Sequence, residues 1–88
     1  MPSKENANNA TSASKPIVLD EALFMQIRLF SLFCKRNPSI PPSDMDALFR
    51  KCSIWDFIDE GYEGLHTEGD EAIYQEILDI FNSRGVEL

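Results

Sequence analysis

Apolar side chains recur every three or four residues along most of this chain, which is the period of one helix face. The pattern predicts a first helix over about 21–36, a second that begins at 42 or 44 and ends near 51, and a last one ending near 83. A short apolar helix is predicted between Ser53 and Gly61. No segment of four or more residues bounded by turn signals alternates apolar and polar side chains as a strand would. We therefore expect an all-α fold, a small bundle of three to four helices.

Local signals mark where these helices begin and end. Asp20 is a predicted N-cap of the first helix, and Pro38 ends it. Ser39 or Ser43 is expected to cap the second helix, and Ser53 the short one, with Asp56 completing a weak capping box. We expect Gly61 to stop the short helix in a left-handed conformation. The last helix starts at 68 or 70 and ends before Gly85, which occupies the usual C′ position.

The first helix has an unusually wide apolar surface. Four of its side chains cluster within about 60° of the helical wheel, and the full arc spans roughly 220°, whereas a surface helix needs about 100°. The helix is therefore either central, packed on two sides, or meets a partner with part of its surface. The clustered residues are Leu23, Ile27, Phe30 and Cys34; the interface predicted for a partner or second copy is Met25, Leu29, Leu32 and Phe33.

The first sixteen residues have a different composition from the rest. They contain only Met1 and three alanines from the apolar set, too few to offset the entropy of ordering them. We expect residues 1–16 to be a disordered tail and residues 17–88 to be a single helical domain. So small a domain buries a modest fraction of its surface, and a partner or self-association would stabilise it.

Charge is distributed unevenly along the chain. The net charge is −7, and residues 52–88 hold ten acidic side chains against one basic one, Arg84. The basic residues of the first two helices could form one patch, but the acidic remainder would repel phosphate, so DNA binding is the less favoured prediction. We expect the patch to pair with the acidic half of this chain or with a partner; its members are Arg28, Lys35, Arg36, Arg50 and Lys51.

The cysteines and the hydropathy indicate the compartment. Cys34 and Cys52 fall on apolar helix faces, so we expect two reduced, buried thiols. No apolar export segment follows Met1, and no apolar run reaches the length of a membrane span. The prediction is a cytoplasmic protein that does not bind a membrane.

Candidate chemistry is sparse. His66 is the only histidine, and no catalytic triad, phosphate loop or metal-ligand spacing surrounds it. We predict no catalytic, cofactor or metal site and no small-molecule substrate. His66 is expected to tie down the turn before the last helix through ring hydrogen bonds. A small enzyme or regulator built on His66 is the alternative.

One stretch resembles a known family. Trp55 to Ile58, the sequence from Tyr62 to Gly69 and the following amphipathic helix are similar to a family of short bacterial proteins of unknown function, over roughly residues 20–84. The family signature reads Tyr-x-x-Leu-His-Thr-x-Gly. It is matched by Tyr62, Leu65, His66, Thr67 and Gly69, which we expect to have a structural or interaction role.

The resemblance implies a role by association only. The family has no assigned activity, and its members are often encoded beside small genes, including genes for proteins that look like ADP-ribosyltransferase toxins. This implies an antitoxin-like or accessory function. The sequence departs from the family pattern in its proline-rich connector over 37–43.

The predicted function is therefore a non-enzymatic, acidic protein-interaction module. The wide apolar arc of the first helix, the small core and the acidic second half favour it over the other classes. The alternative is a structural helical protein that self-associates as a dimer.

Overall fold

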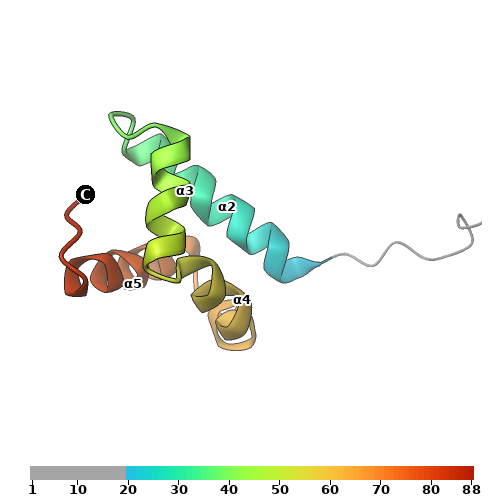
Figure 1. The fold of residues 1–88 in the computed structure, drawn as a ribbon. Coiled ribbons are helices and arrows are strands. Elements are labelled where there is room, and N and C mark those ends of the chain that lie inside the picture. Colours follow the sequence, from blue (N-terminus) through green and yellow to red (C-terminus); the bar gives the residue numbers. More distant parts are fainter. Residues whose placement is uncertain (1–19) are drawn as a thin grey trace, which may run out of the picture.

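The computed structural model describes residues 20–88, and the predicted tail over 1–16 lies outside them. Four helices follow one another: α2 (Glu21–Arg36), α3 (Pro42–Lys51), α4 (Ile54–Leu65) and α5 (Asp70–Ser83) (Figure 1). The part of the chain that the structure describes contains no strand. The predicted all-α class is confirmed.

α2 is the central helix. It contacts each of the other three helices, and α3 returns alongside it (Figure 1). The core is rich in aromatic rings, because Phe33 stacks on Tyr74 with centroids 4.1 Å apart and meets Phe49 and Phe81 edge-on. Such pairs add to the stabilisation from buried area. The largest fully buried side chains are Phe33, Phe49, Phe81, Leu29, Met45, Ile54, Ile58, Ile73 and Ile77.

The ends of α2 and α5 follow the sequence signals. Asp20 caps α2, since its Oδ1 accepts a hydrogen bond from the Leu23 N–H at 3.0 Å. α5 ends in a Schellman motif, in which the Val86 N–H donates to the Phe81 carbonyl at 2.8 Å and Gly85 has φ of 80°. Both predicted ends are confirmed.

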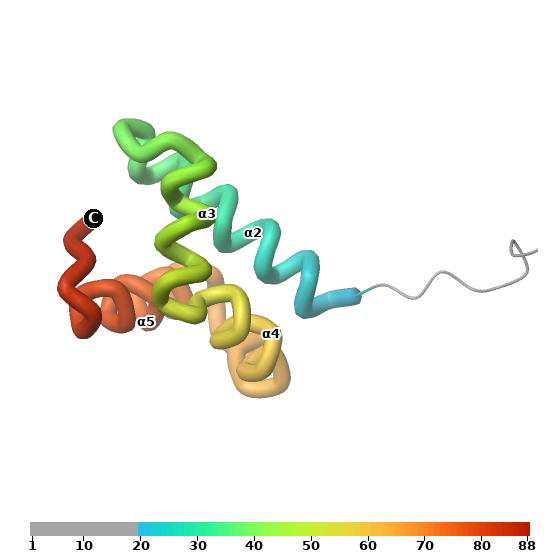
Figure 2. The backbone as a smooth tube through the Cα atoms, in the orientation of Figure 1, coloured from blue at the N-terminus to red at the C-terminus, as the bar shows by residue number. Residues whose placement is uncertain are grey.

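α3 and α4 begin at predicted positions, Pro42 and Ile54, but the predicted side-chain caps are wrong. Neither Ser39 nor Ser43 caps α3, whose N-cap is Pro41 with no side-chain hydrogen bond. Ser53 does precede α4, but it is left-handed, with φ of 57°, and its side chain caps nothing. Ser53 adopts this conformation where the chain turns sharply from α3 into α4 (Figure 2).

α4 continues past its predicted stop. The helix runs through Gly61 and Gly64 to Leu65. Ile54, Ile58 and Leu65 lie on one buried face at positions i, i+4 and i+11, and Gly61 occupies position i+7 of that face. Burial of Leu65 therefore outweighs the preference of glycine for a helix end.

The interface predicted on α2 is wrong. Met25, Leu29 and Phe33 are buried inside this one chain, at 2%, 0% and 0% exposure, and Leu32 is half-buried against the core. The other helices cover this side of the apolar arc and also contact Phe30 and Cys34, so the large apolar side chains of α2 that stay exposed are Leu23, Phe24 and Ile27. Met25, Leu29 and Phe33 belong to the core of this fold, so they are not available to a second copy.

The cysteines form no disulfide. Both are free thiols, and of the two predicted to be buried Cys52 is buried while Cys34 is half-buried. Burial raises the pKa of the Cys34 thiol. Within residues 20–88 no helix has the length and apolar character needed to cross a membrane.

Candidate functional site

The first two turns of α2 expose a group of large apolar side chains. Leu23, Phe24 and Ile27 are 48%, 51% and 51% exposed, and we call them the α2 patch. Leu23 and Ile27 are one turn apart, on the opposite side of the helix from Met25 and Leu29. Isolated exposed apolar residues are common, but here three of them are adjacent and form one exposed apolar surface.

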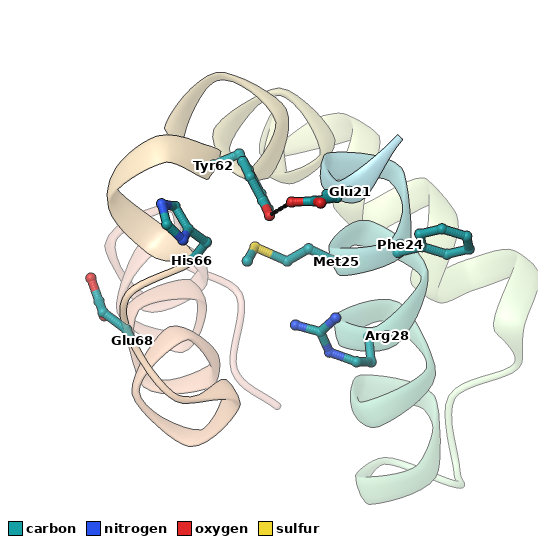
Figure 3. A pocket seen from close by; sticks show the side chains of 7 residues that line it. All are labelled: Glu21, Phe24, Met25, Arg28, Tyr62, His66 and Glu68. Carbon is teal, nitrogen blue, oxygen red and sulfur yellow. Dashed lines mark hydrogen bonds between the residues drawn. The ribbon is translucent and has the colours of Figure 1, made fainter. Parts of the chain in front are cut away.

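A pocket lies beside this patch. It has a volume of about 330 Å³ and opens between the start of α2 and the end of α4 (Figure 3). Phe24 belongs both to the patch and to the pocket wall, although its ring points away from the other lining side chains. We call it the α2–α4 pocket, and it is lined by Glu21, Phe24, Met25, Arg28, Tyr62, His66 and Glu68.

A hydrogen bond joins the two sides of the pocket. The Tyr62 hydroxyl donates to Glu21 Oε1 at 2.5 Å, which links α4 to the first turn of α2. That bond to a carboxylate raises the pKa of the Tyr62 phenol. The Tyr62 ring stacks on His66, four residues later, with centroids 5.1 Å apart. The Met25 side chain lies between the two sides (Figure 3).

Two arginines of α2 are paired with the first turn of α5. Arg28 donates to both carboxylate oxygens of Asp70 at 3.0 Å, and Arg36 donates to both of Glu71 at 2.9 and 2.7 Å. The guanidinium of Arg28 lowers the pKa of Asp70. These bidentate pairs fix α5 against α2 and compensate the charge of Arg28 at the pocket.

Three residues of the predicted basic patch form ion pairs within this chain. Arg28 and Arg36 pair with the acidic half, as expected, while Arg50 pairs with Asp46 on its own helix at 2.8 Å. Lys35 and Lys51, the other two residues of the predicted patch, form no ion pair with a residue in 20–88. The charges of these three arginines are therefore less available to phosphate.

The signature residues form the α4–α5 corner. Leu65 is buried in the core, Gly69 is the N-cap of α5, and Tyr62 contributes to the pocket. Thr67 does not cap α5: its hydroxyl donates to the Gly64 carbonyl at 2.8 Å and so closes the end of α4. His66 is exposed, and its ring makes no hydrogen bond to a described residue; it stacks on Tyr62 instead.

The His66 ring forms no hydrogen bond with a nucleophile or carboxylate among the described residues. Residues 20–88 also hold no group of three or more histidine, cysteine or acidic side chains arranged to bind a metal ion. Carboxylates, aromatic rings and an exposed apolar patch are what the surface offers.

A family comparison covers most of this structure. The family model described as a protein of unknown function, DUF3791, matches residues 30–83, from the middle of α2 to the end of α5. The chain belongs to the DUF3791 family. No curated protein and no solved structure matches it. The DUF3791 match contains the α4 side of the pocket and begins after the α2 patch.

Sequence reasoning missed the patch and the α2 side of the pocket. The helical wheel grouped Leu23 and Ile27 correctly but did not show which of the two apolar directions is covered. The paired arginines offer the missing signal, because Arg28 and Arg36 mark the side of α2 that faces acidic α5. No sequence signal connects Glu21 with Tyr62, which are 41 residues apart.

Proposed function

We propose that this DUF3791 chain is a non-enzymatic protein-interaction module, and that its α2 patch binds an amphipathic, basic helix of a partner protein. The observation that supports this most directly is the exposure of Leu23, Phe24 and Ile27 on a helix whose opposite side is fully buried. An apolar helix face of this kind suits the i, i+3, i+4 anchors of a partner helix.

Charge favours a basic partner. Asp20 and Glu21 are exposed beside the patch, and α4, which contacts α2, exposes further carboxylates along its length. None of these α4 carboxylates forms an ion pair with another described residue: Asp56, Asp59, Glu60 and Glu63. Complementary charge steers encounter and selects partners.

The partner that we propose is the toxin-like protein encoded beside members of the resembling family, which gives the chain an antitoxin-like or accessory role. We place this interaction in the reducing cytoplasm, where two free thiols, Cys34 and Cys52, are stable. The pairing of Arg28 and Arg36 with α5 supports a protein partner over nucleic acid.

Co-expression with the product of the adjacent gene tests the proposal. The wild-type chain should co-purify with that product and relieve its toxicity. Ile27→Glu should abolish both effects, because it places a carboxylate at the centre of the apolar contact, while the far-ultraviolet circular dichroism stays unchanged. Leu88→Glu is the matched control, since Leu88 is an exposed apolar residue at the opposite end of the molecule (Figure 1).

Two outcomes would reject the proposal. If Ile27→Glu co-purifies and protects as well as Leu88→Glu, the patch is not the docking surface. If light scattering gives the isolated chain twice its 10.0 kDa mass and Ile27→Glu makes it a monomer, the patch is covered by a second copy. The exposure of Leu23 and Ile27, one turn apart on the same face of α2, is what favours this dimer as the second candidate.

A further inference from the structure

The solvent-facing side of α2 carries charges of opposite sign at its two ends. Five exposed residues follow one another along this side at i, i+4, i+7, i+11 and i+15, and we call them the α2 stripe: Asp20, Phe24, Ile27, Ser31 and Lys35. The stripe passes through two residues of the α2 patch. At 1.5 Å per residue its charged ends lie about 22 Å apart, so the stripe is acidic where α2 begins and basic where α2 ends.

Lys35 keeps its charge available to a partner. α2 has three basic side chains, and two of them, Arg28 and Arg36, are each held by a carboxylate of α5. Lys35 is exposed and forms no ion pair within residues 20–88. Its ammonium group therefore stands on the same side of the helix as Phe24 and Ile27 without a compensating carboxylate.

We propose that the partner helix on the α2 patch carries an acidic side chain that pairs with Lys35. This pairing rests on the proposed function and adds a specificity-determining residue to it. A helix with basic side chains along its whole contact would place like charge against Lys35, whereas one carboxylate at that position turns the repulsion into an ion pair. The partner is then basic elsewhere and acidic at this one position.

The geometry of α2 fixes where that acidic side chain lies. Lys35 is eight residues beyond Ile27, which is about 12 Å along the helix axis. A partner that packs nearly along α2, with a crossing angle of about 20°, stays close over that distance. Ser31 lies between Ile27 and Lys35, and its small side chain lets the partner backbone remain near α2. The acidic side chain is therefore about two turns from the residue that covers Ile27.

The other end of the stripe selects the opposite charge. Asp20 Oδ1 accepts a hydrogen bond from the Leu23 N–H, which leaves the second carboxylate oxygen for a basic side chain of the partner. The partner helix is thus basic over Asp20 and acidic over Lys35.

Two synthetic peptides test the pairing with the full chain. Both are helices of about 18 residues with one leucine face, and they have the same composition and net charge. In the first peptide a glutamate flanks the leucine face at one end and a lysine flanks it at the other. In the second peptide that glutamate is exchanged with a lysine on the opposite face. We expect the first to bind about two- to fivefold more tightly in fluorescence anisotropy.

A charge reversal assigns this preference to Lys35. Lys35→Glu should reverse it, because the first peptide then places its glutamate against a like charge. Lys51→Glu is the matched control, since Lys51 is also exposed, forms no ion pair within residues 20–88 and lies on α3 outside the stripe. It changes the net charge equally and should leave the preference unchanged. Circular dichroism should be the same for both variants.

The pairing and the proposed function fail in different ways. If Lys35→Glu changes the preference no more than Lys51→Glu does, Lys35 does not contact the partner helix. The α2 patch still stands in that case if Ile27→Glu abolishes the binding of both peptides. If neither peptide shifts the NMR methyl signals of Leu23 and Ile27, the patch does not receive a helix and both proposals are wrong.

Discussion

At the scale of single residues, α4 shows how packing overrides local preference. Gly61 is the predicted helix stop, yet Gly61 and Gly64 both lie inside α4, which continues until Leu65 is buried in the core. A Cβ added at Gly61 would lie 3.3 Å from Leu65 Cδ1, whereas one added at Gly64 would meet nothing within 4 Å. Gly61 therefore makes room for Leu65, and Gly64 has no such role.

This difference can be measured with two alanine substitutions. Gly64→Ala should stabilise the fold by about 0.5–1 kcal/mol in urea unfolding, because alanine restricts the unfolded chain and favours the helix. Gly61→Ala should stabilise the fold by less than Gly64→Ala, since the Leu65 side chain has to shift to accommodate the added Cβ. A larger gain at Gly61 than at Gly64 would contradict this account of α4.

His66 gives a second test at this scale. Because its ring is exposed and stacks only on Tyr62, His66→Ala should change the free energy of unfolding by about 0.5 kcal/mol or less. Leu65→Ala, one residue away and buried, should cost about 2–4 kcal/mol. A loss at His66 comparable to that at Leu65 would restore the role in holding the turn that the sequence suggested.

At the scale of helices, the ends of α2 and α5 were predictable and their pairing was not. Asp20, Pro38 and Gly85 act on their immediate neighbours, so their effect is readable from the sequence. The Arg28–Asp70 and Arg36–Glu71 pairs join residues 42 and 35 positions apart. The charge imbalance predicted that such pairs would form, but the choice of partners depends on how α5 crosses α2.

The Arg28–Asp70 pair makes stability depend on acid. The pKa of Asp70 is lowered in the fold, so its contribution is present above the ordinary aspartate pKa of about 4 and is lost as pH falls through the lowered value. Asp70→Asn should cost about 0.2–1 kcal/mol at pH 7, because the pair is partly exposed, and almost nothing near pH 2. The urea midpoint at both pH values measures this.

Glu87→Gln is the control for that comparison, because Glu87 is exposed and forms no ion pair with a described residue. If Asp70→Asn lowers the free energy of unfolding equally at both pH values, the charge of the Asp70 carboxylate does not contribute to stability.

The carboxylate of Glu76 should have the opposite dependence. The pKa of Glu76 is raised, mainly by its hydrogen bond with Glu68, so its charged form opposes folding at neutral pH. Glu76→Gln should therefore raise the melting temperature at pH 7, and the gain should disappear as pH falls below the ordinary glutamate pKa of about 4. A lower melting temperature for this variant at pH 7 would show that the charged form of Glu76 does not oppose folding.

At the scale of the whole molecule, one end of the bundle carries the features that suit binding. The α2 patch, the α2–α4 pocket and uncompensated carboxylates gather where α2 begins and α4 ends. The sequence predicted the all-α class and an apolar surface too wide for one-sided packing. It could not show which side is covered, because that depends on the crossing of α2 with α3, α4 and α5.

The most direct test follows methyl signals of the chain in complex with the product of the adjacent gene. The account predicts that the NMR signals of Leu23 and Ile27 shift on binding, while those of the buried Ile73 and Ile77 and of the distant Leu88 stay in place. Shifts at Leu88 with Ile27 unchanged would contradict it, because the partner would then bind a surface other than the α2 patch.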